Sequence, residues 1–75
     1  NLLASLTRAM TADGKPCEVT NFRALGVGQD NGDVVELKCA SGSGFIAEIP
    51  QDRARAGRVL TCAVSVQRGG DACEL

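Results

Sequence analysis

The segment from Val34 to Pro50, VVELKCASGSGFIAEIP, decides the fold. Apolar and polar residues alternate on both sides of a Ser-Gly run, which is typical of two β-strands with one buried face. A two-residue turn at 42–43 places Leu37 opposite Glu48, which is a poor match. A three-residue turn at 41–43 gives one apolar face, with the pairs Cys39–Phe45, Leu37–Ala47 and Val35–Ile49. We therefore predict a hairpin of strands 34–40 and 45–49, with a left-handed glycine at 42 or 44.

The same register places Glu36 opposite Glu48 on the other face. Like charges directly opposite each other are destabilising. The commoner arrangement is a pair of solvated glutamates whose mutual repulsion is reduced by Lys38 on the diagonal. The sharper hypothesis is a carboxylate pair that binds a cation or a basic partner.

The N-terminal segment has helical periodicity. One stripe contains Leu2, Leu3, Leu6, Ala9 and Met10, so we predict an amphipathic helix over residues 2–12. Asn1 is the expected N-cap, and Asp13-Gly14 followed by Pro16 is the expected end.

Two further strand signals flank the hairpin. Residues 17–25, CEVTNFRAL, have the composition of a strand, and the QDNGD cluster at 29–33 predicts a turn centred on Asn31-Gly32. Residues 59–67 fit either a short helix or a strand, Gly69-Gly70 ends that segment, and 72–75 fit a closing strand. We treat 59–75 as a C-terminal segment tied by a cystine.

Length and cysteines limit the class of protein. Seventy-five residues form one domain, 1–75, and the only aromatic residues are two phenylalanines. A chain this short has a marginal core and needs additional cross-links. The four cysteines lie far apart, and there is no histidine, so the spacing does not predict a zinc site or any other metal or cofactor site. The cysteines are interpreted as two disulfides in an oxidising compartment, rather than as four buried thiols.

Three disulfide pairings are open. We favour Cys17–Cys39 with Cys62–Cys73, because closure between neighbours in sequence is easiest to form. In the simplest first hairpin, however, Phe22 lies opposite Leu37 and the chain at Cys17 runs past Cys39. The favoured pairing therefore requires a bulge or a bent strand.

Several functional classes are excluded or disfavoured. Without histidine, no Ser-His or Cys-His nucleophile can form, and we predict no enzyme and no catalytic residue. A net charge of −1 and the absence of Trp and Tyr disfavour nucleic-acid binding. No apolar run reaches the roughly 20 residues that span a bilayer.

One local charge cluster remains. Arg53, Arg55 and Arg58 lie within six positions. They form either a solvated face or a docking patch for an acidic protein surface or an anionic lipid headgroup.

Three runs carry a family resemblance: CEVTNFRALG from Cys17, VVELKCASGSGFI from Val34, and a later CAV…GGDACEL. Together they resemble uncharacterised secreted proteins of proteobacteria, some of which look like tandem copies of one unit. The resemblance implies secretion, two disulfides and an origin as one unit of a longer protein, and it implies no active site. A start at Asn1 without Met fits a processed protein or a domain from a longer chain.

These observations predict an α+β domain, in which an N-terminal amphipathic helix packs on a small antiparallel sheet of three or four strands, stapled by disulfides. The predicted function is a non-enzymatic periplasmic or surface accessory module that docks on another protein or a larger complex, including one at a membrane. The alternative is a small secreted inhibitor or ligand-binding module that acts through an exposed loop such as 26–33 or 41–44.

Overall fold

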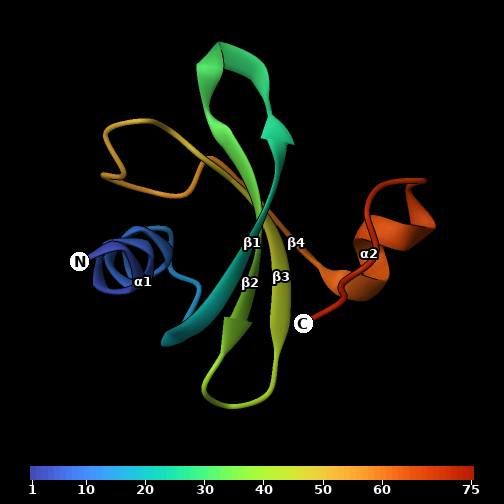
Figure 1. Ribbon diagram of the computed structural model, residues 1–75, viewed down its shortest axis with the longest axis horizontal. Helices are drawn as coiled ribbons and strands as arrows, with labels where there is room; N and C mark the ends of the chain where they lie inside the picture. The colour runs from blue at the N-terminus through green and yellow to red at the C-terminus, as the bar shows by residue number, and fades with distance from the viewer.

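The fold is a four-stranded antiparallel sheet with a helix on each face (Figure 1). The computed structural model describes residues 1–75. Its strands follow chain order across the sheet: β1 (Val19–Val27), β2 (Asp33–Cys39), β3 (Gly44–Ile49) and β4 (Arg58–Thr61). Helix α1 (Leu2–Ala12) covers one face, here called the inner face, and α2 (Cys62–Gln67) lies on the outer face. The predicted α+β architecture is confirmed.

Helix α1 begins and ends where the sequence indicates. The Asn1 side chain accepts a hydrogen bond from the Ala4 N–H at 3.0 Å, which caps the first turn. After the Asp13 cap, Gly14 adopts a left-handed conformation with φ +76. Thr7 fastens the helix to the sheet, because its hydroxyl accepts the Val19 N–H at 2.9 Å.

The core lies between α1 and the inner face. Its buried members are aliphatic or cysteine, and both phenylalanines pack at its edge. The buried cluster consists of Leu6, Met10, Cys17, Val19, Val35, Leu37, Cys39, Ala47, Ile49 and Ala56.

The β2–β3 hairpin has the predicted faces but a different register. The Cys39 N–H donates to Ser43 O at 2.8 Å, so the three-residue turn is Ala40–Gly42 rather than Ser41–Ser43. Leu37 consequently lies opposite Phe45, two residues from its predicted partner Ala47. A shift of two preserves the face of every side chain, because side chains alternate with period two. Gly42, at φ +97, is the left-handed residue of the turn.

A bulge in β1 makes the first disulfide feasible. Phe22 lies opposite Leu37, as the simplest hairpin predicts, but the register shifts between Val19 and Asn21. The extra residue brings Val19 opposite Cys39. Cys17 then lies close enough to form the Cys17–Cys39 disulfide, with a Cα–Cα distance of 5.1 Å. The second disulfide is Cys62–Cys73, so the structure has the favoured pairing.

Other boundaries differ from the predictions by a few residues. Strand β1 covers Val19–Val27 instead of 17–25. The β1–β2 turn has Asp30 and Asn31 in the left-handed conformation, at φ 59 and 60, so its centre lies one residue before the predicted Asn31-Gly32. Both residue types tolerate this conformation better than most residues with a side chain.

The C-terminal segment is mostly not a strand. Residues 59–61 belong to β4 and residues 62–67 to α2, so the ambiguous stretch contains both element types. Residues 72–75 form neither helix nor strand, and the expected closing strand is wrong. The Ser65 hydroxyl donates to Asp71 O at 2.7 Å, and the Cys62–Cys73 disulfide holds the same turn.

The hairpin turn yields a stability prediction. We expect Gly42→Ala to lower the free energy of unfolding by about 1 kcal/mol, because a Cβ disfavours the left-handed conformation. Nothing lies within 4 Å of the added Cβ, so backbone strain is the only expected cost. Ser43→Ala in the same loop is the control and should be near neutral. Equal urea midpoints for the two variants would contradict the assignment.

Candidate functional site

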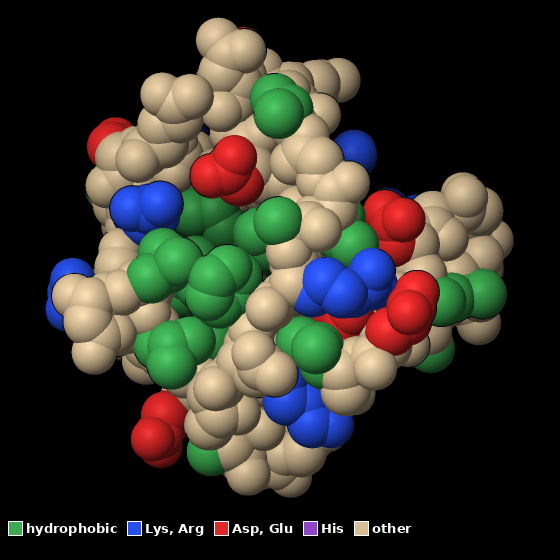
Figure 2. Space-filling view, in the orientation of Figure 1, with side chains coloured by type: hydrophobic (Ala, Val, Ile, Leu, Met, Phe, Trp, Pro, Cys, Tyr) green, Lys and Arg blue, Asp and Glu red, His purple; other side chains and the backbone are tan.

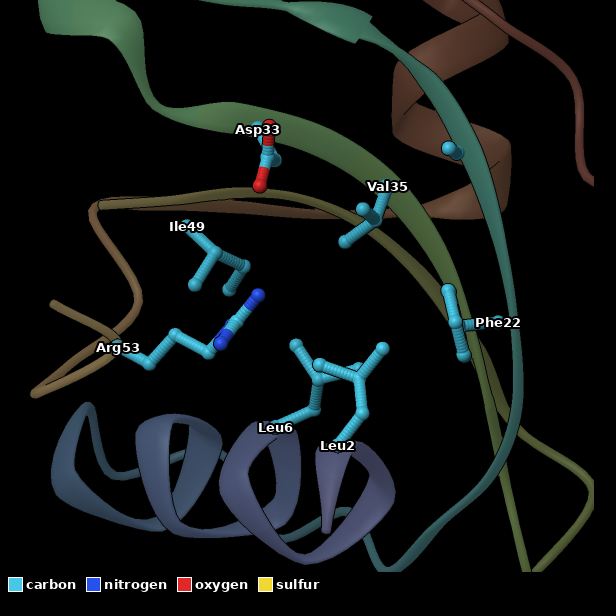
Figure 3. A pocket seen from close by; sticks show the side chains of 8 residues that line it. Leu2, Leu6, Phe22, Asp33, Val35, Ile49 and Arg53 are labelled. Atoms are coloured by element: carbon cyan, nitrogen blue, oxygen red, sulfur yellow. The ribbon is translucent and has the colours of Figure 1, made fainter. Parts of the chain in front are cut away.

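A small apolar pocket lies between α1 and the inner face of the sheet (Figure 3). Its volume is about 150 Å³. We call it the α1 pocket, and its lining consists of Leu2, Leu6, Phe22, Ala24, Val35, Ile49, Asp33 and Arg53. An apolar cavity of about this volume holds one benzene-sized group, whereas sites for drug-sized molecules begin near 300 Å³. The α1 pocket therefore matches one apolar side chain.

The surface around the pocket is apolar and is bordered by charged side chains. Figure 2 shows hydrophobic side chains gathered over α1 and the adjoining sheet, with basic and acidic groups beside them. Leu2, at the mouth, remains 37% exposed. Apolar patches edged by polar groups are typical of interaction surfaces.

Two opposite charges face the pocket from different elements. Arg53 extends from the β3–β4 loop toward the cavity, and Asp33 points toward it from the first residue of β2 (Figure 3). They do not form an ion pair with each other, because both ion pairs in the structure involve Arg23. Both charges are thus available to a bound group.

The loop that carries Arg53 is anchored at its end. The Ala56 N–H donates to Ala9 O of α1 at 3.1 Å, and Gly57 N–H donates to Glu48 O at 2.8 Å. Ala56 is completely buried. Arg53 itself has φ 53, an uncommon conformation for a residue with a Cβ. Such strained residues cluster at functional sites, so the loop supplies a second reason to consider Arg53 functional.

Glu36 lies on the outer face and is only 1% exposed. Its carboxylate accepts the backbone N–H groups of Glu74 and Leu75, each at 2.9 Å, and forms an ion pair with Arg23 at 2.9 Å. Burial by itself raises the pKa of Glu36, but these N–H donors and Arg23 together hold the pKa below its ordinary value. Arg23 also donates to Ala72 O at 3.1 Å. The Arg23–Glu36 pair therefore fastens the C-terminal segment to the sheet.

The expected opposition of Glu36 and Glu48 is corrected by the hairpin register. Glu36 lies opposite Ile46, and Glu48 lies opposite Val34. The Glu48 carboxylate accepts the Gln29 N–H at 2.9 Å and so supports the β1–β2 loop. The two carboxylates have separate partners and fasten separate segments.

The three arginines of the expected docking patch lie in different settings. Arg53 lines the α1 pocket. Arg58 begins β4 opposite Glu48, and it precedes Val59, which packs on the core. Strand alternation therefore directs Arg58 to the outer face. Arg55 is exposed in the loop between them.

Three further features bear on chemistry and location. No group of three or more His, Cys, Asp or Glu side chains in residues 1–75 is placed to hold a metal ion. No helix here combines the length and apolarity needed to cross a bilayer. The two disulfides leave no free cysteine, and structural disulfides are typical of proteins outside the reducing cytosol.

Comparisons with known proteins found no relative: no family model, curated protein or solved structure matches the chain. The resemblance to secreted proteobacterial proteins stays a prediction. The function has to be inferred from the chemistry of this chain's own surface.

The sequence contained only part of the pocket. Leu2, Leu6 and Phe22 could be assigned to apolar positions of a helix and a strand. The sequence did not indicate a functional role for Asp33, because it belongs to a cluster of residues typical of an ordinary turn. Asp33 lines the pocket together with Arg53, which is 20 positions away in the sequence, and only folding brings the two residues to the same cavity.

We expect Glu36→Gln to lower the free energy of unfolding at pH 7 by about 2 kcal/mol, because a buried charge-assisted network loses its anion. The lowered pKa means that the unfolded chain binds the proton first as pH falls. This stabilisation is therefore complete above about pH 4.5, the ordinary value, and is lost below it as pH falls through the folded pKa. Urea unfolding from pH 2 to 7 measures both effects.

The matched control is Glu74→Gln. The Glu74 carboxylate is exposed and lies 3.7 Å from the same guanidinium, so its removal should change stability little. An unchanged acid slope in Glu36→Gln would contradict the assigned role of Glu36.

Proposed function

We propose that this chain is a non-enzymatic accessory module of the periplasm or cell surface that docks on a larger protein assembly. The α1 pocket carries the proposal. It is a cavity for one apolar side chain, edged by Arg53 and Asp33, whose charges are not paired with each other. A partner protein would insert an apolar anchor there.

The side-chain chemistry favours binding over catalysis. The chain has no histidine, and the pocket is lined by no hydroxyl, thiol or amine side chain. The buried carboxylate of Glu36 is occupied by backbone N–H groups and Arg23. Asp33 is the one lining group able to accept a proton, and no nucleophile or second acid–base residue lines the pocket with it.

The extracytoplasmic location is supported by the disulfides. Cys17–Cys39 ties the β1 entry to β2 within the core, and Cys62–Cys73 ties the short α2 to the C-terminal segment. A module that depends on such cross-links functions where they persist, outside the reducing cytosol.

The size of the pocket indicates that the interface extends beyond it. One buried Leu-sized side chain contributes about 1.5–3 kcal/mol, and association costs at least about 4 kcal/mol in lost freedom. A specific interface buries about 800 Å² per partner, which is roughly a fifth of the 4478 Å² surface of this domain. The apolar surface around α1 would supply the remainder.

A second candidate is an inhibitor or ligand-binding module that uses the β1–β2 loop. This loop protrudes from the sheet (Figure 1) and has an acidic tip at Asp30. Val27 at its base is 72% exposed. The loop is supported by the Glu48–Gln29 hydrogen bond and by a Gly28 N–H to Gly32 O bond of 2.7 Å. An ordered, protruding loop of this kind favours insertion into a partner's cleft.

Site-specific crosslinking tests the docking proposal. We expect a photo-crosslinking residue at Arg55, exposed in the loop that carries Arg53, to capture a discrete partner in cells that make the native protein. The same residue at Ala63, exposed on α2, should not capture that partner. Ala24→Phe should abolish the Arg55 crosslink, because the added ring fills the pocket.

Ala63→Phe is the matched control and should leave the crosslink intact. Capture that survives Ala24→Phe but is lost in Asp30→Ala would overturn the pocket as the docking site and support the loop.

A further inference from the structure

We infer that the partner presents one Leu-, Ile-, Met- or Phe-sized side chain to the α1 pocket, flanked by an acidic group that meets Arg53 and a basic group that meets Asp33. The inference rests on the proposed docking function, and it adds the chemistry of the partner segment.

The size of the cavity selects a single apolar group. About 150 Å³ accommodates a benzene-sized group. The walls come from α1 and from three strands, and the sheet is fixed by its hydrogen bonds. Leu6 and Ile49, at 3% and 2% exposure, are firmly packed, so the cavity offers little room for a second anchor.

The charges select what surrounds that group. Arg53 and Asp33 both line the cavity without forming an ion pair with each other. A partner that covers them removes water from both, which is unfavourable unless each meets an opposite charge. Juxtaposed like charges across an interface are costly. A segment with both signs satisfies both groups.

The two charges lie on different sides of the pocket. Asp33 is held in the sheet between Val27 and Ile49. Arg53 lies in a turn closed by its own N–H donating to Pro50 O at 2.9 Å. Figure 3 shows the Arg53 guanidinium between Ile49 and Leu6 and the Asp33 side chain on the β2 side of Ile49, so the acidic group would lie toward α1 and the basic group toward β2. Charge order on the partner thus determines its orientation.

Three acetylated and amidated pentapeptides test the inference by NMR titration of the ¹⁵N-labelled domain: Gly-Asp-Leu-Lys-Gly, its charge-reversed form Gly-Lys-Leu-Asp-Gly, and the neutral Gly-Asn-Leu-Gln-Gly. We expect small, fast-exchange shifts at the pocket-lining residues, because one anchor does not offset the cost of association, and the three peptides are compared at equal high concentration. Each charged peptide should bind at least about threefold more tightly than the neutral one, given the usual strength of exposed ion pairs, because either charge order can meet both groups by reversing the direction of the peptide chain. The preference should shrink at high salt.

Removing the two charges should abolish the preference for charged peptides. In the double variant Asp33→Asn, Arg53→Asn, the charged and neutral peptides should bind equally. Asparagine tolerates the left-handed backbone at position 53. The single variants Asp33→Asn and Arg53→Asn should each reduce the preference and remain informative if the double variant does not fold.

Each contrary outcome has a definite meaning. Equal binding of all three peptides would overturn the charge inference and leave the pocket as a docking site. Absence of pocket shifts with every peptide would overturn the inference, while the Arg55 crosslink decides the docking function separately. Pocket shifts that depend on domain concentration without peptide would assign the pocket to a second copy of the chain and overturn it too.

Discussion

The register of the β2–β3 hairpin is the constraint on which the rest of the structure depends. Gly42 adopts the left-handed conformation that closes the turn, and the pairing of Leu37 with Phe45 follows from it. Since side chains alternate along a strand, this register directs Leu37 toward α1 and Glu36 away from it. A slip of one residue would bury the Glu36 carboxylate in the aliphatic core, where no cation is present to receive it.

The two faces of the sheet use charge in opposite ways. On the outer face, Arg23 and two backbone N–H groups satisfy Glu36, so its charge is used to hold the C-terminal segment in place. On the inner face, Arg53 and Asp33 stand at the edge of an apolar cavity without pairing with each other. A buried charge with all its hydrogen-bond partners supports the structure, whereas exposed opposite charges beside an apolar cavity are available to a partner. This contrast is why the α1 pocket, rather than the Glu36 network, is the proposed functional site.

The disulfides explain how so small a domain maintains both faces. A chain of this length hides only about 60% of the surface exposed by its unfolded form. Cys17–Cys39 joins the segment after α1 to the central strand, and Cys62–Cys73 closes the α2 turn beside Gly44. Loops of these sizes stabilise the fold by roughly 3 kcal/mol each through the unfolded state. Cross-linking thus compensates for a core with few large side chains.

The sequence by itself determined the elements and their faces. Helical periodicity predicted α1 and its Asn1 cap, and the alternation of apolar and polar residues predicted the inner face of β2 and β3. The positions of the cysteines favoured the observed disulfide pairing and indicated that it requires a bulge. These features are local, or depend only on which face a residue occupies.

Tertiary structure decided the rest. The hairpin turn lies one residue earlier than predicted, so Glu36 and Glu48 are not opposite each other. The C-terminal residues donate backbone N–H groups to the Glu36 carboxylate and do not form a strand. Asp33 and Arg53 were brought to one cavity. Such contacts join residues far apart in sequence, and no local pattern records them, because they form only when the packed sheet and helix fix where each loop ends.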